Sequence, residues 1–246
     1  MTHPNLPSVA LVTGATRGIG VEVVRQLAEQ GSTVFVSGRD TARVEQTAQR
    51  LAGSGDVRPL PTALDVTDPA QVEGAIRSLR DGIGRLDILV NNAVAAIDVS
   101  QSATGAEPAD VSQVLQTNLV GAWALIRAAL PLLRRSSHPR IVNVSSGAGS
   151  HGDPEFGLAV AGGLAAPYAV SKAALNALTS ALAAELSATP ILVNAVCPGL
   201  TASDGRPPEP GVRILQQGAA TIDWAATLAD DGPSGGLFRD GRPLPW

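Results

Sequence analysis

The sequence predicts an α/β protein with a doubly wound parallel sheet and helices on both faces. Short runs of β-branched and apolar residues alternate with longer amphipathic stretches, as repeated strand–helix–strand units require. The first such run, residues 9–13, is almost wholly apolar, which is typical of a strand covered by helices on both sides. A length of 246 residues suits one α/β domain, so we expect residues 1–246 to form a single domain.

Each element is expected where the hydrophobic period and its boundary residues agree. The first helix ends before Gly31, the third opens with Pro69 in its first turn, and Pro131 is expected to bend the fourth. The seven expected strands are residues 9–13, 33–37, 57–64, 86–90, 141–144, 191–196 and 236–238. The expected helices are residues 18–30, 41–52, 69–81, 108–135, 166–187 and 215–228.

Composition excludes several classes of protein. A single cysteine, Cys197, rules out a disulfide framework and favours a reducing compartment. No apolar run approaches the roughly 20 residues of a membrane span, and the first ten residues lack the pattern of a secretory leader. A net charge of −4 without a basic stripe argues against a nucleic-acid partner. We therefore expect a cytoplasmic protein with no membrane, nucleic-acid or metal ligand.

A glycine-rich turn connects the first expected strand to the first expected helix. It reads Thr-Gly-Ala-Thr-Arg-Gly-Ile-Gly over residues 13–20. Glycine lets the backbone approach a diphosphate, and a helix N-terminus adds about half a positive charge. The spacing differs from the Gly-x-Gly-x-x-Gly pattern, but its place between strand and helix predicts a dinucleotide site rather than a plain connection. The expected contacts are Gly14, Thr16, Arg17, Gly18, Ile19 and Gly20.

The end of the second expected strand predicts which dinucleotide binds. Arg39 stands where an acidic residue would grip the ribose of NAD, and an arginine there accommodates the extra phosphate of NADP. Arg17 is placed to reach the same phosphate. Asp40, one residue further on, is expected to cap the next helix instead. We therefore expect NADP(H) rather than NAD(H).

Two further strand ends carry polar residues. Asp65, followed by Val66, is placed to accept from an adenine amine, although a plain turn before Pro69 is an equal alternative. Asn91, Asn92 and Ala93 close the fourth strand, where backbone and amide groups can line a cofactor.

The only tyrosine and the only lysine of the chain stand four residues apart, at Tyr168 and Lys172. On a helix this spacing puts both side chains on one face. A free tyrosine has a pKa near 10, and an adjacent ammonium is expected to draw it towards the working range. A hydroxyl from Ser146 would then hold a substrate carbonyl in the same pocket.

Two irregular stretches interrupt the strand–helix alternation, at residues 147–163 and 201–211. Both follow the carboxyl ends of expected strands, which is the edge where open α/β sheets bind ligands. His151, Phe156 and Leu158 of the first stretch are candidates to line a substrate pocket.

These motifs, in this order and over nearly the whole chain, resemble the short-chain dehydrogenase/reductase family. They are Thr-Gly-x-x-x-Gly-x-Gly at 13–20, Asn-Asn-Ala at 91–93, Val-Ser-Ser-x-x-Gly around Ser146, Tyr-x-x-Ser-Lys at 168–172 and Pro-Gly at 198–199. The resemblance implies a seven-stranded Rossmann-type sheet and hydride transfer between NAD(P) and a carbonyl or alcohol. The ending, residues 231–246, is similar to NADPH-dependent carbonyl reductases of the menthone and xenobiotic-ketone type.

The resemblance also implies residue roles. Tyr168 is the general acid, Lys172 lowers its pKa and holds the nicotinamide ribose, and Ser146 orients the carbonyl. Asn118 positions a relay water through the helix backbone. Cofactor contacts are implied for Asn92, Ala93, Pro198, Gly199 and Ser203, with Thr201 as a rival to Ser203 for the carboxamide.

The chain departs from the family pattern at Val94, where glycine is usual, and in the 22-residue step from Ser146 to Tyr168. The extra residues, around 151–163, are expected to loop over the pocket or the neighbouring helices. The family commonly dimerises through the helices at 108–135 and 166–187, so we expect a homo-oligomer rather than a monomer.

The sequence thus predicts an NADPH-dependent carbonyl reductase acting on a ketone or aldehyde. Two alternatives stay open: an NAD-linked alcohol dehydrogenase, and a non-catalytic dinucleotide sensor on the same fold. The substrate, the pathway and the stereochemistry are not determined by sequence.

Overall fold

The described part of the chain, residues 7–95, 98–202 and 210–246 of a computed structural model, forms one sheet flanked by helices. The strands are β1 (Val9–Val12), β2 (Thr33–Val36), β3 (Val57–Pro59), β4 (Ile88–Asn91), β5 (Arg140–Val144), β6 (Leu192–Val196), β7 (Leu237–Arg239) and β8 (Arg242–Pro243). Their order is β3-β2-β1-β4-β5-β6-β7-β8, and every neighbouring pair is parallel except β7 and β8. The strand order reverses between β1 and β4, which is where such sheets bind ligands.

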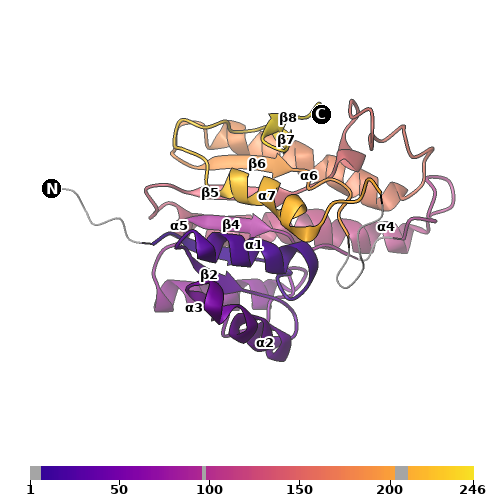
Figure 1. Ribbon diagram of the computed structural model, residues 1–246. Helices are drawn as coiled ribbons and strands as arrows, with labels where there is room; N and C mark the ends of the chain where they lie inside the picture. The colour runs from indigo at the N-terminus through magenta and orange to yellow at the C-terminus, as the bar shows by residue number, and fades with distance from the viewer. Residues whose placement is uncertain (1–6, 96–97, 203–209) are drawn as a thin grey trace.

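Helices cover both faces of the sheet (Figure 1). One face packs against α3 (Pro69–Gly82), α5 (Ala122–Leu133) and α6 (Ala166–Glu185), and the other against α1 (Gly18–Glu29), α2 (Thr41–Leu51) and α7 (Leu215–Ala226). The remaining helix, α4 (Pro108–Leu115), contacts α6. The predicted fold class, a doubly wound α/β sheet covered on both faces, is confirmed.

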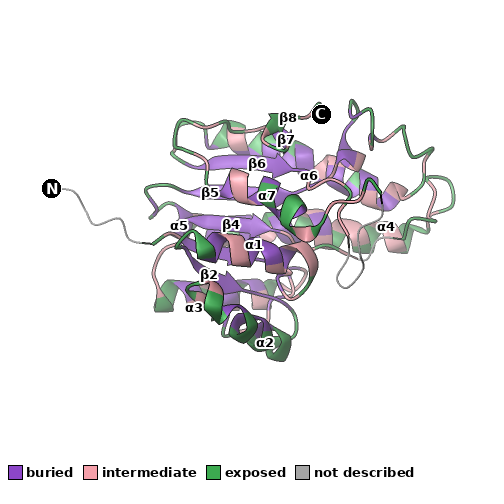
Figure 2. Ribbon diagram, viewed as in Figure 1, coloured by how far each residue is buried: buried purple, intermediate pink, exposed green. Residues whose placement is uncertain are grey.

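Strand β1 shows why the sheet is buried on both sides. Val9 and Leu11 belong to the core under α3, α5 and α6, whereas Ala10 and Val12 belong to the core under α1, α2 and α7. Side chains alternate between the faces of a strand, so a strand between two helical layers must be apolar throughout. The inner strands of the sheet are accordingly purple in Figure 2, while the helices turn exposed sides outward.

The structure adds one strand to the predicted seven. After β7 the chain turns at Asp240 and Gly241, both with positive φ, and pairs back as the two-residue antiparallel strand β8. An Asp-Gly pair favours this tight turn, because glycine and, at lower cost, aspartate adopt the left-handed conformation. Strand β3 is shorter than predicted and ends at Pro59.

The long helix predicted over residues 108–135 is helical from Pro108 to Leu133, but its winding changes in the middle. Between α4 and α5 lies a π-helical turn, η2 (Gln116–Gly121), which carries Asn118. Pro131 lies inside α5, near its end, and the bend expected there stays a prediction. Single π turns in helices often accompany functional sites, which directs attention to this segment.

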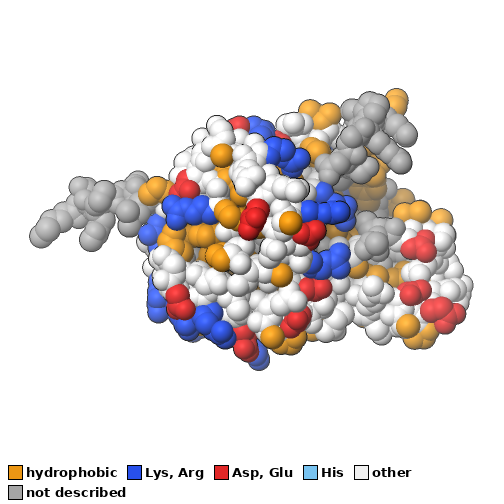
Figure 3. Space-filling view, turned by 90° about the horizontal axis from the view of Figure 1, so that it is seen from below, with side chains coloured by type: hydrophobic (Ala, Val, Ile, Leu, Met, Phe, Trp, Pro, Cys, Tyr) orange, Lys and Arg blue, Asp and Glu red, His pale blue; other side chains and the backbone are white. Residues whose placement is uncertain are grey.

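The outer surface mixes charges of both signs. On the face that Figure 3 shows, acidic and basic side chains are interspersed and hydrophobic side chains are scattered. Among the residues that the structure describes, no helix combines the length and the apolar character that a membrane crossing requires.

Candidate active site

The glycine-rich turn after β1 is held against the end of β4. Thr13 Oγ1 accepts hydrogen bonds from the backbone N–H groups of Asn92 and Ala93, both at 2.9 Å. Gly14 has a φ of +61°, and a Cβ at Gly20 would come within 2.6 Å of Asn92 Nδ2 and 2.7 Å of the Gly14 carbonyl oxygen. Asn92 Nδ2 donates to the carbonyls of Thr13 and Gly14. Both N–H groups of the Asn92 side-chain amide are therefore used to hold the glycine-rich turn in shape.

Helix α1 begins at Gly18, directly after the glycine-rich turn. Its N-cap residue, Arg17, has an extended backbone and makes no side-chain cap hydrogen bond, and a Cβ at Gly18 would meet nothing within 4 Å. Thr16 and Ile19 belong to the same partly exposed turn. A helix N-terminus that follows a glycine-rich turn fits the diphosphate of a dinucleotide.

Two arginines of this region are exposed. Arg17 and Arg39 form no ion pair within the described ranges, so both guanidinium groups are available to a phosphate. Asp40 caps α2 by accepting from the backbone N–H of Arg43 at 3.2 Å, as predicted. The Asp40 carboxylate is thereby engaged with the first turn of α2, and Arg39 is the charged residue available at the end of β2.

Asp65 builds a turn, the alternative that the sequence left open. Its Oδ1 accepts from the backbone N–H of Thr67 at 2.9 Å and from the Thr67 hydroxyl at 2.7 Å. Val66 is buried, and a Cβ at Gly121 would come within 2.7 Å of Val66 Cγ2. The segment after β3 is thus fixed against the π turn.

Ser146 and Tyr168 come together from distant parts of the sequence. Ser146 follows β5, Tyr168 lies in the first turn of α6, and the Ser146 hydroxyl is near enough to the phenol to lower its pKa. Lys172, one helical turn on, is 3% exposed and places Nζ 5.6 Å from the centre of the Tyr168 ring. The same ammonium donates to the Val144 carbonyl at 2.7 Å. The three groups converge at the carboxyl edge of the sheet.

The pKa of Tyr168 corrects an expectation from the sequence. Burial raises it to about 12, and the Ser146 hydrogen bond opposes this rise only in part. Burial also lowers the pKa of Lys172 to about 8, although the nearby Cys197 favours its charged form. The predicted lowering of the tyrosine pKa by its lysine is therefore wrong: removal from water disfavours the charged forms of both groups, and the nearby Cys197 raises the pKa of the phenol further. The phenol stays protonated at neutral pH, which suits a proton donor.

Asn118 connects three elements at this site. Its Oδ1 accepts from the backbone N–H of Ala95 at 2.9 Å, and its Nδ2 donates to Ser171 Oγ at 2.9 Å. Ser171 Oγ in turn donates to the Tyr168 carbonyl at 2.6 Å. Ser171 was missed as a functional residue, although the motif Tyr-x-x-Ser-Lys contains it. The chain of bonds fixes the start of α6, and with it the phenol.

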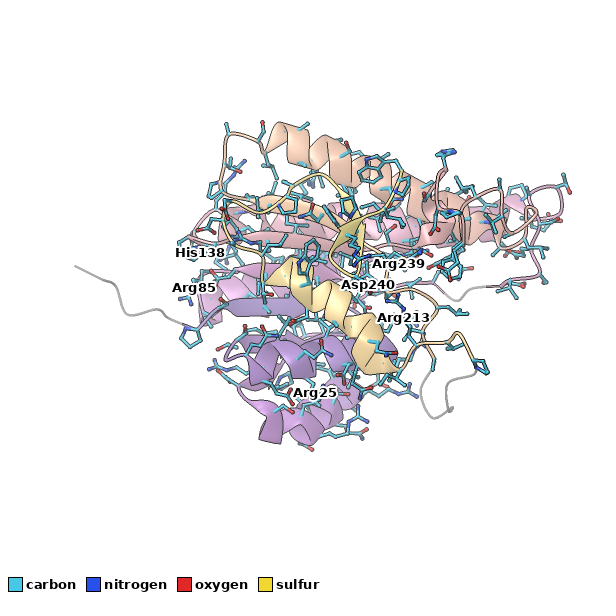
Figure 4. The ribbon with its side chains drawn as sticks, turned by 45° about the horizontal axis from the view of Figure 1, so that its top comes forward. Arg25, Arg85, His138, Arg213, Arg239 and Asp240 are labelled. Carbon is cyan, nitrogen blue, oxygen red and sulfur yellow. The ribbon has the colours of Figure 1, made fainter. Side chains whose placement is uncertain are left out.

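The segment after β6 is held by an ion pair that the sequence did not reveal. Gly199 has a φ of +73°, and a Cβ there would come within 2.7 Å of Arg213 Nε. Arg213 makes two hydrogen bonds, of 2.6 and 2.7 Å, to Asp240 in the turn between β7 and β8 (Figure 4). The Arg213 guanidinium, held by Asp240, therefore packs against Pro198 and Gly199.

Of the two candidates for the carboxamide, Ser203 lies outside the described residues. Thr201 Oγ1 donates to the Pro198 and Gly199 carbonyls, both at 3.2 Å, and lies against Gly218 of α7.

Fold and site define a dinucleotide-dependent oxidoreductase of the doubly wound α/β class. A sequence profile described as short chain dehydrogenase matches residues 8–209, and the chain belongs to this family. Among its relatives is a protein of Streptomyces violaceoruber named as a ketoacyl reductase of the granaticin polyketide synthase. That protein is 39% identical over 196 residues, which span 78% of this chain and 66%, just under two thirds, of the relative.

Solved structures show the same fold over almost the whole chain. The NADPH-bound carbonyl reductase from chicken fatty liver superposes with a TM-score of 0.84 at 27% identity, covering 98% of this chain and 100% of that one. The RhlG/NADP complex of Pseudomonas aeruginosa superposes with a TM-score of 0.80 at 30% identity, covering 97% and 98%.

Proposed function

We propose that the chain is an NADPH-dependent carbonyl reductase that reduces a ketone or aldehyde, with residues 1–246 acting as one dinucleotide-binding and catalytic domain. The observation that carries the proposal is the convergence of three groups: Tyr168, the buried Lys172 with its Nζ 5.6 Å from the centre of the tyrosine ring, and Ser146, whose hydroxyl is near enough to lower the pKa of the phenol. A binding module needs a glycine turn, but it has no use for a phenol, a hydroxyl and an ammonium converging on one point.

The proposed chemistry follows from these three groups. The substrate carbonyl oxygen accepts hydrogen bonds from Tyr168 Oη and Ser146 Oγ, which polarise it and fix its position. NADPH, when bound, supplies the hydride that reaches the carbonyl carbon. Tyr168 transfers its proton to the oxygen, and the Lys172 ammonium stabilises the phenolate left behind. Asn118 acts through Ser171, by fixing the first turn of α6.

We assign the cofactor site to the edge of the sheet at which the parallel strands have their carboxyl ends. The start of α1 and the glycine turn take the diphosphate, and Arg17 and Arg39 take the extra phosphate of NADPH. The bound cofactors named for the two solved neighbours support this choice. The remaining proposed contacts are Asp65 and Val66 on the adenine side and Asn92, Ala93, Tyr168, Lys172, Pro198, Gly199 and Ser203 on the nicotinamide side.

Tyr168→Phe tests the reaction. The variant keeps the ring but removes the transferable proton, so we expect kcat for ketone reduction to fall about 10²- to 10⁴-fold. NADPH binding, followed by fluorescence titration, should persist. Unchanged ketone reduction would favour the dinucleotide sensor instead.

Arg39→Asp tests the cofactor. Loss of a charge-assisted phosphate contact should weaken NADPH binding about 10- to 100-fold while sparing NADH. The control is Arg77→Asp on α3, which makes the same charge change away from the turn. Tighter binding of NAD than NADP by the wild type would favour the NAD-linked alcohol dehydrogenase.

We also propose that the protein forms a homo-oligomer through the face of η2, α5 and α6. Three apolar side chains are exposed on these elements, with 43% of Val120, 53% of Trp123 and 49% of Val170 accessible. Burial of this face against a second copy would remove them from water.

A further inference from the structure

The extra residues between β5 and α6 are tied down by the C-terminal part of the chain. Ser150 Oγ donates to the Pro245 carbonyl at 2.5 Å, and the Gly152 N–H donates to the Trp246 carbonyl at 3.1 Å. A Cβ at Gly152 would come within 2.6 Å of Pro245 Cβ. The segment 150–158 thus rests on the strand hairpin β7–β8 and the residues that follow it.

Arg239, at the end of β7, adds charged contacts to these hydrogen bonds. Its guanidinium forms an ion pair with Asp153 and a second one, of 3.1 Å, with Glu155, and it lies 5.0 Å from the centre of the Phe156 ring. We name the pair of Asp153 and Arg239 the clamp. The Asp153 side chain is 0% exposed and the Arg239 side chain 13% exposed, so both charges lie in a nearly dry environment.

The segment is ordered around Asp153 itself. The carboxylate accepts from the Glu155 N–H at 2.9 Å, and the Asp153 carbonyl accepts from the Gly157 N–H at 3.0 Å. Ser150 Oγ accepts from the Asp153 N–H at 2.9 Å. Movement of Asp153 would therefore break these three hydrogen bonds of the segment.

The clamp touches the catalytic turn directly. A Cβ at Gly147, the residue after Ser146, would overlap both the Asp153 carboxylate and the Arg239 guanidinium. The Gly147 N–H donates to Cys197 Sγ at 3.1 Å, and Arg239 Nη2 donates to the same sulfur at 3.5 Å. The clamp thereby fixes the backbone on which Ser146 presents its hydroxyl. Figure 4 shows Arg239 next to Arg213 and Asp240, far from Arg25, Arg85 and His138.

We infer that Arg239 is a positioning residue: by clamping segment 150–158 onto the turn of Ser146, it sets the geometry in which the carbonyl meets Ser146 and Tyr168. The inference rests on the proposed function for its kinetic consequence. A buried ion pair adds little net stability but is costly to break, because the remaining charge stays in a dry site. The pair is accordingly suited to hold a single arrangement of the loop.

The test compares Arg239→Met with Arg239→Lys and with the control Arg242→Met. Arg242 lies on the same hairpin, is exposed, and forms no ion pair within the described ranges. A catalytic group displaced by about 1 Å can cost about 100-fold, so we expect a loss of this order in kcat for a ketone in Arg239→Met, with KM for NADPH within about twofold of the wild type. Arg239→Lys should recover part of the loss, since its ammonium can still pair with Asp153. Arg242→Met should match the wild type.

Hydrogen exchange separates positioning from a general loss of stability. In Arg239→Met the amides of residues 150–158 should exchange at least about tenfold faster, while those of β1, β4 and α1 keep their wild-type rates. Should the variant fail to fold, the double variant Asp153→Asn/Arg239→Met removes both charges, and we expect it to fold with the same kinetic loss and the same local exchange.

The inference is overturned by a folded variant that keeps wild-type kcat, or by a kinetic loss without faster exchange in 150–158. If the wild type reduces no carbonyl compound, the proposed function fails instead. The exchange comparison then still decides whether Arg239 holds the segment, and unchanged exchange would refute the clamp.

Discussion

Burial acts in opposite directions on the two titratable residues at the centre of the site. It raises the pKa of Tyr168 to about 12 and lowers the pKa of Lys172 to about 8, because a dry environment disfavours the charged form of each. The lysine ammonium is partly compensated by the Val144 carbonyl, at 2.7 Å. Tyr168 is then a protonated phenol beside the Lys172 ammonium, whose pKa is about 8. In this state the phenol can give its proton to a carbonyl oxygen.

The lowered pKa of Lys172 has a measurable effect on stability. The unfolded chain holds this proton up to about pH 10.5, whereas the native protein releases it near pH 8. Between these values the unfolded state binds more protons, so the free energy of unfolding rises with pH. From about pH 7.5 to about pH 9.5 we expect the wild type to gain about 2 kcal/mol relative to Lys172→Met.

Urea unfolding of both proteins at the two pH values measures this difference. Tyr168 does not interfere, because its raised pKa makes stability fall with pH only above about pH 10. Parallel pH dependence in wild type and variant would show that Lys172 keeps an ordinary pKa.

At the scale of elements, the π turn η2 adapts a helix to the site. It places Asn118 where the side chain bonds both the segment after β4 and Ser171 of α6. Gly121, at its end, lies so close to Val66 that a Cβ would come within 2.9 Å of the Val66 carbonyl oxygen. Neither constraint follows from helical periodicity, which is why one long helix was expected here.

Replacement of glycine by alanine should therefore change the free energy of unfolding in opposite directions in two helical segments. We expect Gly121→Ala to destabilise the protein by about 1–3 kcal/mol, since the buried backbone of Val66 must move. Gly74→Ala on α3 should stabilise it by up to about 1 kcal/mol, because its Cβ meets nothing within 4 Å and alanine favours a helix. Urea unfolding midpoints of the two variants give both values. Equal effects would mean that Val66 does not constrain the turn.

At the scale of the whole molecule, two apolar cores fill the space between sheet and helices, and the exposed apolar side chains lie elsewhere. Trp123 on α5 is large, half exposed and close in sequence to the exposed Val120. An exposed tryptophan among apolar neighbours is typical of the centre of an interface. The proposed oligomer would cover it.

Trp123→Glu tests the assembly by placing a charge at the centre of that face. We expect the dissociation constant of the oligomer to rise about 30-fold or more, measured by sedimentation equilibrium. Arg77→Asp, on a helix outside the proposed face, serves as the control. A wild type that sediments as a monomer at all concentrations would refute the oligomer.

Much of the site was predictable because its residues stand next to strand ends. The glycine turn, Arg39, Asn92, Ser146 and Pro198 each follow a strand, and parallel strands bring such residues to one edge. Ser171, Arg213 and Arg239 were not predicted. Ser171 lies in the Tyr-x-x-Ser-Lys motif, but its bond to Asn118 joins distant parts of the chain, as do the ion pairs of Arg213 and Arg239. Hydrophobic period and local motifs do not report such distant partners.

The sequence by itself determined the order of strands and helices along the chain, the glycine-rich turn between β1 and α1, and the pairing of the only tyrosine with the only lysine. These are local properties, set by side-chain period, glycine and helical spacing. Only the tertiary structure decided the acidity of the phenol, the π turn in the long helix and the contacts between segment 150–158 and the C-terminal hairpin. Each of these depends on how much water and which distant groups surround a residue once the chain has packed.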